Sequence, residues 1–314
     1  MKIYYPSYYE KFRCIAAACP DSCCKSWEIV IDEETCKKYD SVSGEFGERI
    51  RSSITTDSEG DRCFALHSGR CPFLNCDGLC DIHIKLGEDF TSEICKAHPR
   101  FTEVYDGFTE ISLSLSCPEA NRIIAEVHNE KYPVPEYSGD DEVLSILISS
   151  RKNLLDAQCG FYELVSLILN TSADDSLDID MVYIADFPEF NVSFIKEFIK
   201  ALKCNEILTD EWREMLSLAE KYEVCAEDMS KAIGENEYLL IKFCRYMLYR
   251  YYLKAVNDLD VYSRALLIVS SCYLTAYLSF VTGTPFMECA RLFSKETEHN
   301  TDNIDRLTDY FCSF

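Results

Sequence analysis

Glycine is scarce in this sequence, with 11 glycines among 314 residues. None of them is arranged as Gly-x-Gly-x-x-Gly or as Gly-x-x-x-x-Gly-Lys. Those patterns let a backbone come close to the phosphates of a nucleotide. The sequence therefore gives no support for a Rossmann or P-loop nucleotide site.

Basic residues are also few, since 31 Lys and Arg stand against 54 Asp and Glu, a formal net charge of −23. Nucleic-acid-binding proteins need clustered Lys and Arg, and anionic membranes attract basic segments. We therefore expect no nucleic acid as a partner and no anionic membrane surface. An apolar leader is also absent, because residues 1–12 include Lys2, Glu10 and Lys11. We expect a cytoplasmic, reducing location.

Cysteine is the residue that the chain has in excess, with 18 copies. In a small secreted chain they would predict disulfides, but in a long cytoplasmic chain clustered cysteines more often bind metal or take part in chemistry. Eleven cysteines precede residue 120. The other seven lie singly in helical patterns and are predicted to be small buried hydrophobes: Cys159, Cys204, Cys225, Cys244, Cys272, Cys289 and Cys312.

The spacing of the early cysteines is the strongest signal in the chain. It runs Cys14-x4-Cys19-x3-Cys23-Cys24, then Cys71-x8-Cys80, then Cys95 and Cys117. Thiolates suit zinc or iron–sulfur clusters, and each such centre takes about four of them. Two adjacent cysteines do not readily face one small ion. We therefore expect Cys23 and Cys24 to bind different centres, or one of them to lie next to the ligands without binding the metal itself.

The identity of the metal stays open at this point. Cys19-x3-Cys23 and Cys76-x3-Cys80 have the spacing of zinc knuckles, but the remaining cysteines are widely scattered. The radical S-adenosylmethionine pattern Cys-x3-Cys-x2-Cys is missed, because position 26 is Ser. His83 and His98 lie in the same region and are weaker candidate ligands.

The pattern of apolar residues divides the chain into two regions. Residues 1–130 form a cysteine-rich region with short strands, among them Trp27–Ile31 and a hairpin over Thr102–Ser116 with a type I′ turn at Asp106-Gly107. It has little regular core, so we expect a bound metal to hold it together. After a proline-containing linker, residues 140–314 read as an α-helical bundle domain. The predicted fold class is mainly α, with helices over Asp140–Leu154, Phe161–Asn170, Ser193–Cys204, Asp210–Tyr222, Glu237–Val256, Val261–Val281 and Ile304–Phe311.

One stretch is long enough to cross a bilayer, because residues 265–287 carry no charge. It contains several Ser and Thr residues and Pro285, and no other stretch resembles it. We therefore expect a buried helix of the bundle and no membrane span.

The early region resembles a known family, the flagellin lysine N-methylases, which share an eight-cysteine pattern with zinc- or iron-chelating domain proteins. The resemblance covers roughly residues 10–120, and several motifs occur in a fixed order. The matching residues are Phe12-x-Cys14, Cys19-x3-Cys23-Cys24-x2-Trp27, Cys71-Pro-Phe-Leu74, Leu79-Cys80, Leu86-Gly-Glu88, Ser92-x2-Cys95, Pro99-Arg100 and Ser112-Leu-Ser-Leu-Ser-Cys-Pro-Glu119.

The resemblance implies S-adenosylmethionine-dependent methylation of lysine ε-amino groups on flagellin. It also implies a [4Fe-4S] cluster, with a structural zinc as the alternative. Cys36, Cys63 and Cys76 fall outside the family pattern. The ligand set that carries over is Cys14, Cys19, Cys23, Cys24, Cys71, Cys80, Cys95 and Cys117.

Chemistry adds one candidate for binding the methyl donor. Arg100 can hold the carboxylate of the methionine moiety, because a guanidinium matches a carboxylate with two hydrogen bonds. The rival interpretation is a structural Arg beside the cluster. No catalytic base is singled out, and the oligomeric state has no signal in the sequence. The alternative function is a non-enzymatic metal-binding or adaptor protein that uses the same cysteines.

Overall fold

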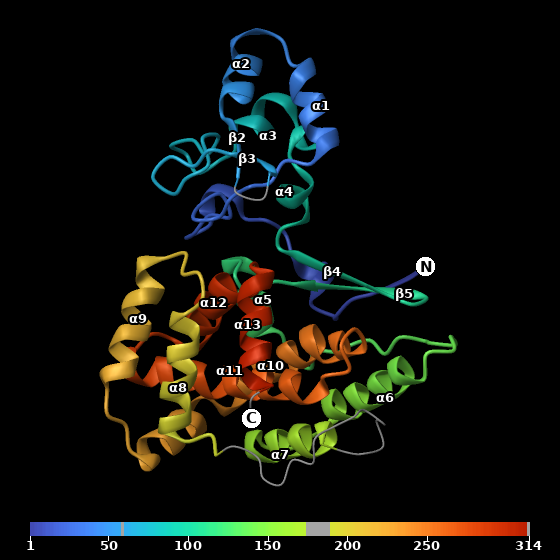
Figure 1. Ribbon diagram of the computed structural model, residues 1–314, viewed down its shortest axis with the longest axis vertical. Coiled ribbons are helices and arrows are strands. Elements are labelled where there is room, and N and C mark those ends of the chain that lie inside the picture. Colours follow the sequence, from blue (N-terminus) through green and yellow to red (C-terminus); the bar gives the residue numbers. More distant parts are fainter. Residues whose placement is uncertain (58–59, 174–188, 313–314) are drawn as a thin grey trace.

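The structure is a computed structural model that describes residues 1–57, 60–173 and 189–312. A small lobe stands on a larger helical body (Figure 1). Helices dominate the described residues, so the mainly α fold class is confirmed. The lobe contains the short elements α1 (Glu33–Ser41), α2 (Gly44–Ser52), β2 (Ile54–Thr56), β3 (Arg62–Phe64), α3 (Asp81–Leu86) and α4 (Glu93–Ala97).

The lobe has a small hydrophobic cluster of its own, which the sequence did not lead us to expect. Asp32 caps α1 by accepting a hydrogen bond from the backbone N–H of Thr35. The helix then turns its buried side toward the pair β2 and β3 and the loop that follows them. The cluster consists of Ile29, Ile31, Cys36, Tyr39, Ile50, Phe64, Cys71, Phe73 and Ile82.

A three-stranded sheet lies where the lobe meets the body (Figure 1). Strand β5 (Phe108–Leu113) pairs antiparallel with β4 (Arg100–Tyr105) and parallel with β1 (Lys2–Tyr4). The predicted hairpin is therefore confirmed. Its turn is not type I′, because that turn needs positive φ at both central residues and only Gly107 has it.

The helical body is built from nine α-helices of the described chain. Each helix predicted from the apolar spacing is present, with α6 capped by Asp141 rather than by Asp140. Their bounds are α5 (Pro118–Glu126), α6 (Glu142–Asp156), α7 (Phe161–Ser172), α8 (Val192–Lys203), α9 (Asp210–Lys221), α10 (Ala226–Tyr251), α11 (Val261–Thr282), α12 (Phe286–Thr297) and α13 (Thr301–Phe311).

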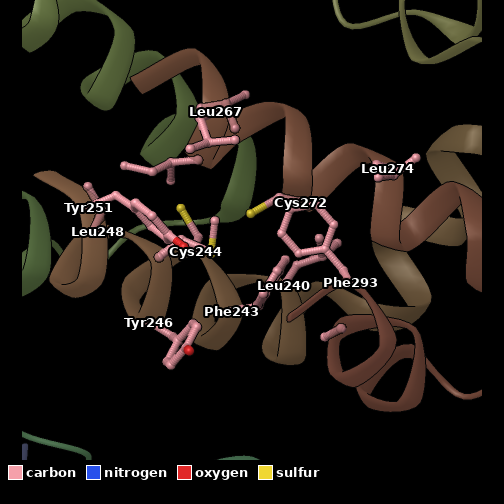
Figure 2. Packing of buried hydrophobic residues seen from close by; sticks show 14 of the residues in the cluster. Leu240, Phe243, Cys244, Tyr246, Leu248, Tyr251, Leu267, Cys272, Leu274 and Phe293 are labelled. Atoms are coloured by element: carbon pink, nitrogen blue, oxygen red, sulfur yellow. The ribbon is translucent and has the colours of Figure 1, made fainter. Parts of the chain in front are cut away.

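Helix α11 is the centre of the body and contacts most of its neighbours, including α10, α12 and α13. It is the one helix of the described chain with the length and hydropathy of a membrane span, and 78% of that window is buried inside the protein. Cys272 on α11 and Cys244 on α10 point toward each other among Leu240, Phe243 and other apolar side chains (Figure 2). The apolar stretch is thus the core helix that we expected.

Other predictions from the sequence were also wrong. Trp27–Ile31 is not a strand, because it has only one bridge, from Val30 to Cys63. Helix α12 and the part of α10 before Glu237 were not anticipated. Of the seven late cysteines, Cys204, Cys225 and Cys312 are exposed rather than buried.

Candidate functional site

Four cysteines of the lobe form one group, which we call the lobe set: Cys24, Cys71, Cys80 and Cys95. The backbone N–H of Cys71 donates to the carbonyl of Cys24 over 2.9 Å, and Cys80 makes a bridge with Leu74. Cys80 is the residue before α3, and Cys95 lies in α4, whose start is tied to Asp32 by a hydrogen bond of 3.0 Å. Hairpin-like pairing and two short helices therefore bring these four thiols together.

The thiols of the lobe set influence one another's pKa values. Burial raises the pKa of the Cys71 thiol to about 12, and the charges of Cys24, Cys80 and Cys95 raise it further. Burial also raises the pKa of Cys95 to about 11, again with contributions from Cys24 and Cys80. Burial raises the pKa of Cys80 as well, and the charge of Cys24 adds to the increase. Every pair in the set therefore interacts.

The other four cysteines form a second group, the junction set: Cys14, Cys19, Cys23 and Cys117. Cys117 is the residue before α5, so it belongs to the helical body. Burial raises its pKa, and the charges of Cys19 and Cys14 add to the increase. The charge of Cys14 also contributes to the raised pKa values of Cys19 and Cys23. This set therefore joins the N-terminal segment to the body.

Contacts around the junction set hold that segment in place. The Asp21 carboxylate accepts hydrogen bonds from Arg291 at 3.0 Å and from Lys295 at 2.7 Å, both on α12. The two cations help to keep the pKa of Asp21 below its ordinary value, although burial acts in the opposite direction. The segment that carries Cys19 and Cys23 is thus anchored on the helical body.

Cys23 and Cys24 are adjacent in sequence, and their other neighbours differ. A hydrogen bond between the two raises the pKa of Cys23 and lowers that of Cys24 to about 7. Cys23 interacts with Cys95 of the lobe set and with Cys14 of the junction set, and Cys24 interacts with all three partners of the lobe set. The pair Cys23 and Cys24 therefore links the two groups of cysteines.

The donor set fits a thiolate-bound inorganic group. All 18 cysteines are free thiols. Several thiols with raised pKa values cannot all ionise beside one another unless a cation compensates their charge. A single zinc ion has sulfurs about 2.3 Å away, hence about 3.8 Å from one another. A cubane cluster keeps its thiolates farther apart, because four iron atoms stand between them.

One close group of possible ligand atoms lies outside the eight predicted cysteines. Among the described residues, only Glu28, Asp57 and Cys63 form a group of three ligand atoms that all lie within 4.8 Å of one another. No three of the eight sulfurs are therefore that close. Of the early cysteines outside the family pattern, Cys36 and Cys63 are buried and Cys76 is exposed.

An aromatic group lies at the junction between lobe and body. The ring of His299 stacks on Trp27 with 4.6 Å between centroids and on Phe101 with 4.8 Å. His98 completes the group, with its ring 5.4 Å from Trp27. Within the described residues, the buried Nε1 of Trp27 has no hydrogen-bond partner. His98 thus packs beside Trp27 and is not among the interacting thiols.

His299 also contacts the serines of the motif Ser112–Glu119. Its Nε2 lies 2.9 Å from Oγ of Ser114 and 2.8 Å from Oγ of Ser116. Ser294 on α12 binds the same loop, because its Oγ accepts from the backbone N–H of Ser116 over 3.0 Å. Burial, Arg250 and Lys295 lower the pKa of His299 to about 4. The imidazole is therefore neutral at pH 7.

Beside His299, the buried Glu298 carboxylate is held by three donors. The hydroxyls of Tyr246 and Tyr251 donate to it over 2.8 Å and 3.1 Å, and Arg250 does so over 3.4 Å. The guanidinium of Arg250 also lies over the ring of Phe101. This network fixes the start of the segment after α12 and hence the position of His299.

Arg100 begins β4 next to the same junction. Its Nε donates to the Tyr9 hydroxyl over 3.0 Å, and its guanidinium lies near the rings of Tyr9 and Phe12. Within the described parts of the chain, no carboxylate lies within ion-pair distance of it. The end of its guanidinium therefore remains available to a ligand, as its predicted role requires.

No sequence pattern indicated that His299 belongs to this site. It is a single histidine 183 residues from Ser116, outside every motif, and only the packing of α12 against the loop after β5 brings the two together. Ser114 and Ser116 did lie in a motif. No residue near them in the sequence, however, suggested that they contact a histidine.

The fold and the site define a class: a mainly α protein with a cysteine-rich lobe and a partly buried histidine where the lobe meets the helical body (Figure 1). Residues 147–313 match the family described as the FliB lysine N-methylase C-terminal domain. That match covers more than half of the chain. The chain therefore belongs to the FliB lysine N-methylase family.

Curated relatives point the same way. The lysine-N-methylases of Salmonella typhimurium (strain LT2) and Salmonella choleraesuis (strain SC-B67) are 33% identical over 120 residues, which is 36% of this chain. The chain spans 30% of the length of these two proteins. The flagellar biosynthetic protein FliU of Salmonella muenchen is also 33% identical over 120 residues, 71% of its length. No solved structure matches the chain.

Proposed function

We propose that this protein transfers methyl groups from S-adenosylmethionine to lysine side chains of flagellin. The observation that carries the proposal is the membership of residues 147–313 in the lysine N-methylase family. The names of the relatives, a flagellar protein among them, support flagellin as the substrate. The proposed location is the cytoplasm, where flagellin is made and where thiols stay reduced.

The proposed reaction needs a neutral lysine nitrogen. A new N–C bond forms as the S–C bond of the sulfonium breaks, which leaves S-adenosylhomocysteine, and the lysine proton goes to a base. His299 is the base that we propose, because its imidazole is neutral and half-exposed at the junction. General bases of this kind accelerate reactions by about 10²- to 10⁴-fold.

The serines set the tautomer of this histidine in the proposal. If Nε2–H donates to the hydroxyl oxygens of Ser114 and Ser116, the proton of the imidazole is on Nε2. Nδ1, for which no hydrogen bond is found in the described residues, then has the lone pair that accepts the lysine proton. Arg100, on the strand beside the junction, holds the carboxylate of the methyl donor.

The eight cysteines hold an iron–sulfur group in this proposal. When bound, the group would supply iron–thiolate bonds that fix the lobe on the helical body. The chain itself supplies the anchoring of that region through Asp21, Arg291 and Lys295. The net charge of −23 favours the approach of a basic, lysine-bearing segment.

The proposal is tested by incubating the protein, purified without oxygen, with S-adenosylmethionine and unmethylated flagellin. Intact mass spectrometry is expected to show flagellin gaining mass in steps of one methyl group. Peptide mapping should place the methyl groups on lysine ε-amino groups. No mass change with metal-loaded protein would contradict the proposal and favour a non-enzymatic adaptor.

A further inference from the structure

We propose that the free edge of strand β4 binds an extended segment of flagellin, which adds a fourth strand to the sheet of β1, β5 and β4. This inference rests on the proposed function, because the segment is the one that carries the lysine. It adds a docking surface and a backbone conformation for the bound substrate, neither of which methyl transfer alone requires. The edge is formed by the outward backbone groups of Arg100, Thr102 and Val104.

The hydrogen bonds of the hairpin show which backbone groups of β4 point away from β5. In an antiparallel pair, residues that bond each other alternate with residues whose N–H and C=O groups point outward. The N–H of Ser114 donates to the carbonyl of Pro99 over 2.7 Å, and these residues lie opposite each other when the register of the two strands is continued. The alternation therefore assigns the bonds to β5 to Phe101, Glu103 and Tyr105. The residues whose groups point outward are Arg100, Thr102 and Val104.

The outward side of β4 is open. Strand β4 is the last strand of its sheet, since the order is β1-β5-β4. Within the described parts of the chain, no other backbone segment forms a hydrogen bond with the outward groups of these three residues. Thr102 is exposed, and so is 68% of the surface of Val104. An open edge of this kind binds an extended segment through main-chain hydrogen bonds.

The edge begins where the lobe meets the helical body, beside the proposed base (Figure 1). The ring of Phe101, the second residue of β4, lies 4.8 Å from the ring of His299. Side chains that lie opposite each other on neighbouring strands point to the same face of the sheet. A residue of the bound segment opposite Phe101 therefore points to the face on which His299 lies. This is the position of the substrate lysine in the proposal.

The charge at the other end of β4 fits a basic segment. Asp106, in the turn after β4, is exposed, and its carboxylate accepts a hydrogen bond from the Tyr137 hydroxyl over 2.9 Å. The same hydroxyl oxygen accepts from the backbone N–H of Asp141 over 3.0 Å, so residues 140–142, all acidic and exposed, lie beside this turn. The cation of β1, Lys2, is already paired with an acid. These carboxylates attract a segment that carries lysine and repel an acidic one.

The exposed side chain of Val104 gives the segment an apolar contact. Val104 comes three residues after Phe101, so the two side chains lie on opposite faces of the sheet. An apolar side chain three residues from the substrate lysine would therefore cover Val104. The main-chain hydrogen bonds do not depend on the sequence of the segment, so several lysines of one protein can use the same edge.

Proline substitutions test the edge directly. Thr102→Pro removes an outward N–H and places a ring where the segment would pair, whereas the bonds to β5 stay, because proline is tolerated on the free side of an edge strand. Thr56→Pro is the matched control, since Thr56 is an exposed threonine of the edge strand β2 in the lobe. The N–H of Ala65 donates to the carbonyl of Ser53 over 2.9 Å, so the same alternation turns the N–H of Thr56 away from β3.

The binding of unmethylated flagellin to the full chain is measured by calorimetry without a methyl donor, and the KM for flagellin is measured in the methylation assay. Thr102→Pro should raise both the Kd and the KM by about 10-fold or more, because a main-chain hydrogen bond is lost and the ring obstructs the segment. Its KM for S-adenosylmethionine should stay constant. Thr56→Pro should keep the Kd and the KM of the unchanged protein. Circular dichroism shows whether both variants are folded.

Hydrogen exchange of the unchanged protein gives a second measurement that needs no substitution. Flagellin should slow the exchange of the outward amides of Thr102 and Val104. The amides of Phe101 and Glu103 are bonded to β5 already and should change little.

Equal Kd values for Thr102→Pro and Thr56→Pro, with unchanged exchange at Thr102 and Val104, would overturn the inference. So would a dimer in which these two amides are protected before flagellin is added, because the edge would then bind a second copy of the chain. Flagellin that binds at the edge without being methylated would support the inference and contradict only the proposed activity. Methylation of flagellin with an unchanged KM in Thr102→Pro would support the activity and reject the edge.

Discussion

Ser116 and His299 are 183 positions apart in the sequence, yet Oγ of the serine lies 2.8 Å from Nε2 of the histidine. The contact joins the cysteine motif that ends at Cys117 to the last part of the helical body. It places a neutral imidazole within the aromatic group that Trp27 and Phe101 form.

Replacing this histidine should slow methylation far more than it changes the fold. If His299 accepts the lysine proton, His299→Gln should reduce the turnover number by about 10²-fold or more. The rate is measured by the mass shift of flagellin at saturating S-adenosylmethionine. His128→Gln is the control, because His128 is exposed and its Nδ1 lies 3.0 Å from the hydroxyl of Tyr238, away from the junction. Equal activity of the two variants would show that His299 is not the base.

The same substitution should change the pH dependence of stability. Burial, Arg250 and Lys295 keep the pKa of His299 at about 4 in the folded protein, against an ordinary value of 6.5. Between these two values the unfolded chain binds a proton that the folded chain does not. The free energy of unfolding therefore falls as pH decreases from about 6.5 to 4.

His299→Gln removes this contribution, so its stability should fall less over that pH range. Urea unfolding between pH 7 and pH 4 measures the difference. His98, whose pKa is lowered to about 3 by burial and by His299, is present in both proteins and contributes a common background. Parallel stability curves for the two proteins would mean that His299 is protonated in the folded state.

Removing the guanidinium of Arg100 should weaken binding of the methyl donor. A charge-assisted pair of hydrogen bonds corresponds to about 10- to 100-fold in affinity, so Arg100→Ala should raise the KM for S-adenosylmethionine by that factor. The KM for flagellin should stay constant. Arg213→Ala on the exposed face of α9 is the control. An unchanged KM together with a lower iron content would assign Arg100 a structural role beside the cluster.

The helical body contains a buried ion pair whose loss should lower the free energy of unfolding. Arg151 on α6 donates two hydrogen bonds to Glu110 on β5, at 2.8 Å and 2.5 Å, and both side chains are buried. Arg151→Met leaves the carboxylate buried without its partner, which costs about 3–5 kcal/mol of stability. Lys152→Met, next to it but in a surface pair with Asp156, should cost about 1 kcal/mol or less. Similar unfolding midpoints for both variants would contradict this.

The cysteine pattern predicted much of the site, because thiols at short spacings need little else to meet in space. For the adjacent pair Cys23-Cys24 we expected either different centres or one thiol outside the ligand set, and this stays a prediction. The pattern gave no grouping for Cys71, Cys80, Cys95 and Cys117, since that depends on how distant segments pack. His299 depends on the same long-range packing and has no local signal.

The fold, too, could be predicted only where it depends on local sequence patterns. Helices of the body with a clear apolar face were predicted to within a few residues, with the exceptions of α12 and the start of α10. That helix has polar residues such as Arg291, Lys295 and Glu296 in its buried part. They are buried because Asp21, Glu288 and Thr209 provide partners. Trp27–Ile31 has the composition of a strand, but its pairing with β3 amounts to a single bridge, between Val30 and Cys63.

The most direct test of the account is the visible absorption spectrum of the protein purified without oxygen, recorded before and after reduction with dithionite. We expect a yellow-brown protein with broad visible absorbance that fades on reduction, and with iron and sulfide in equal amounts. A colourless protein that contains zinc, or one whose early cysteines are joined as disulfides, would contradict the iron–sulfur centre on which the account depends.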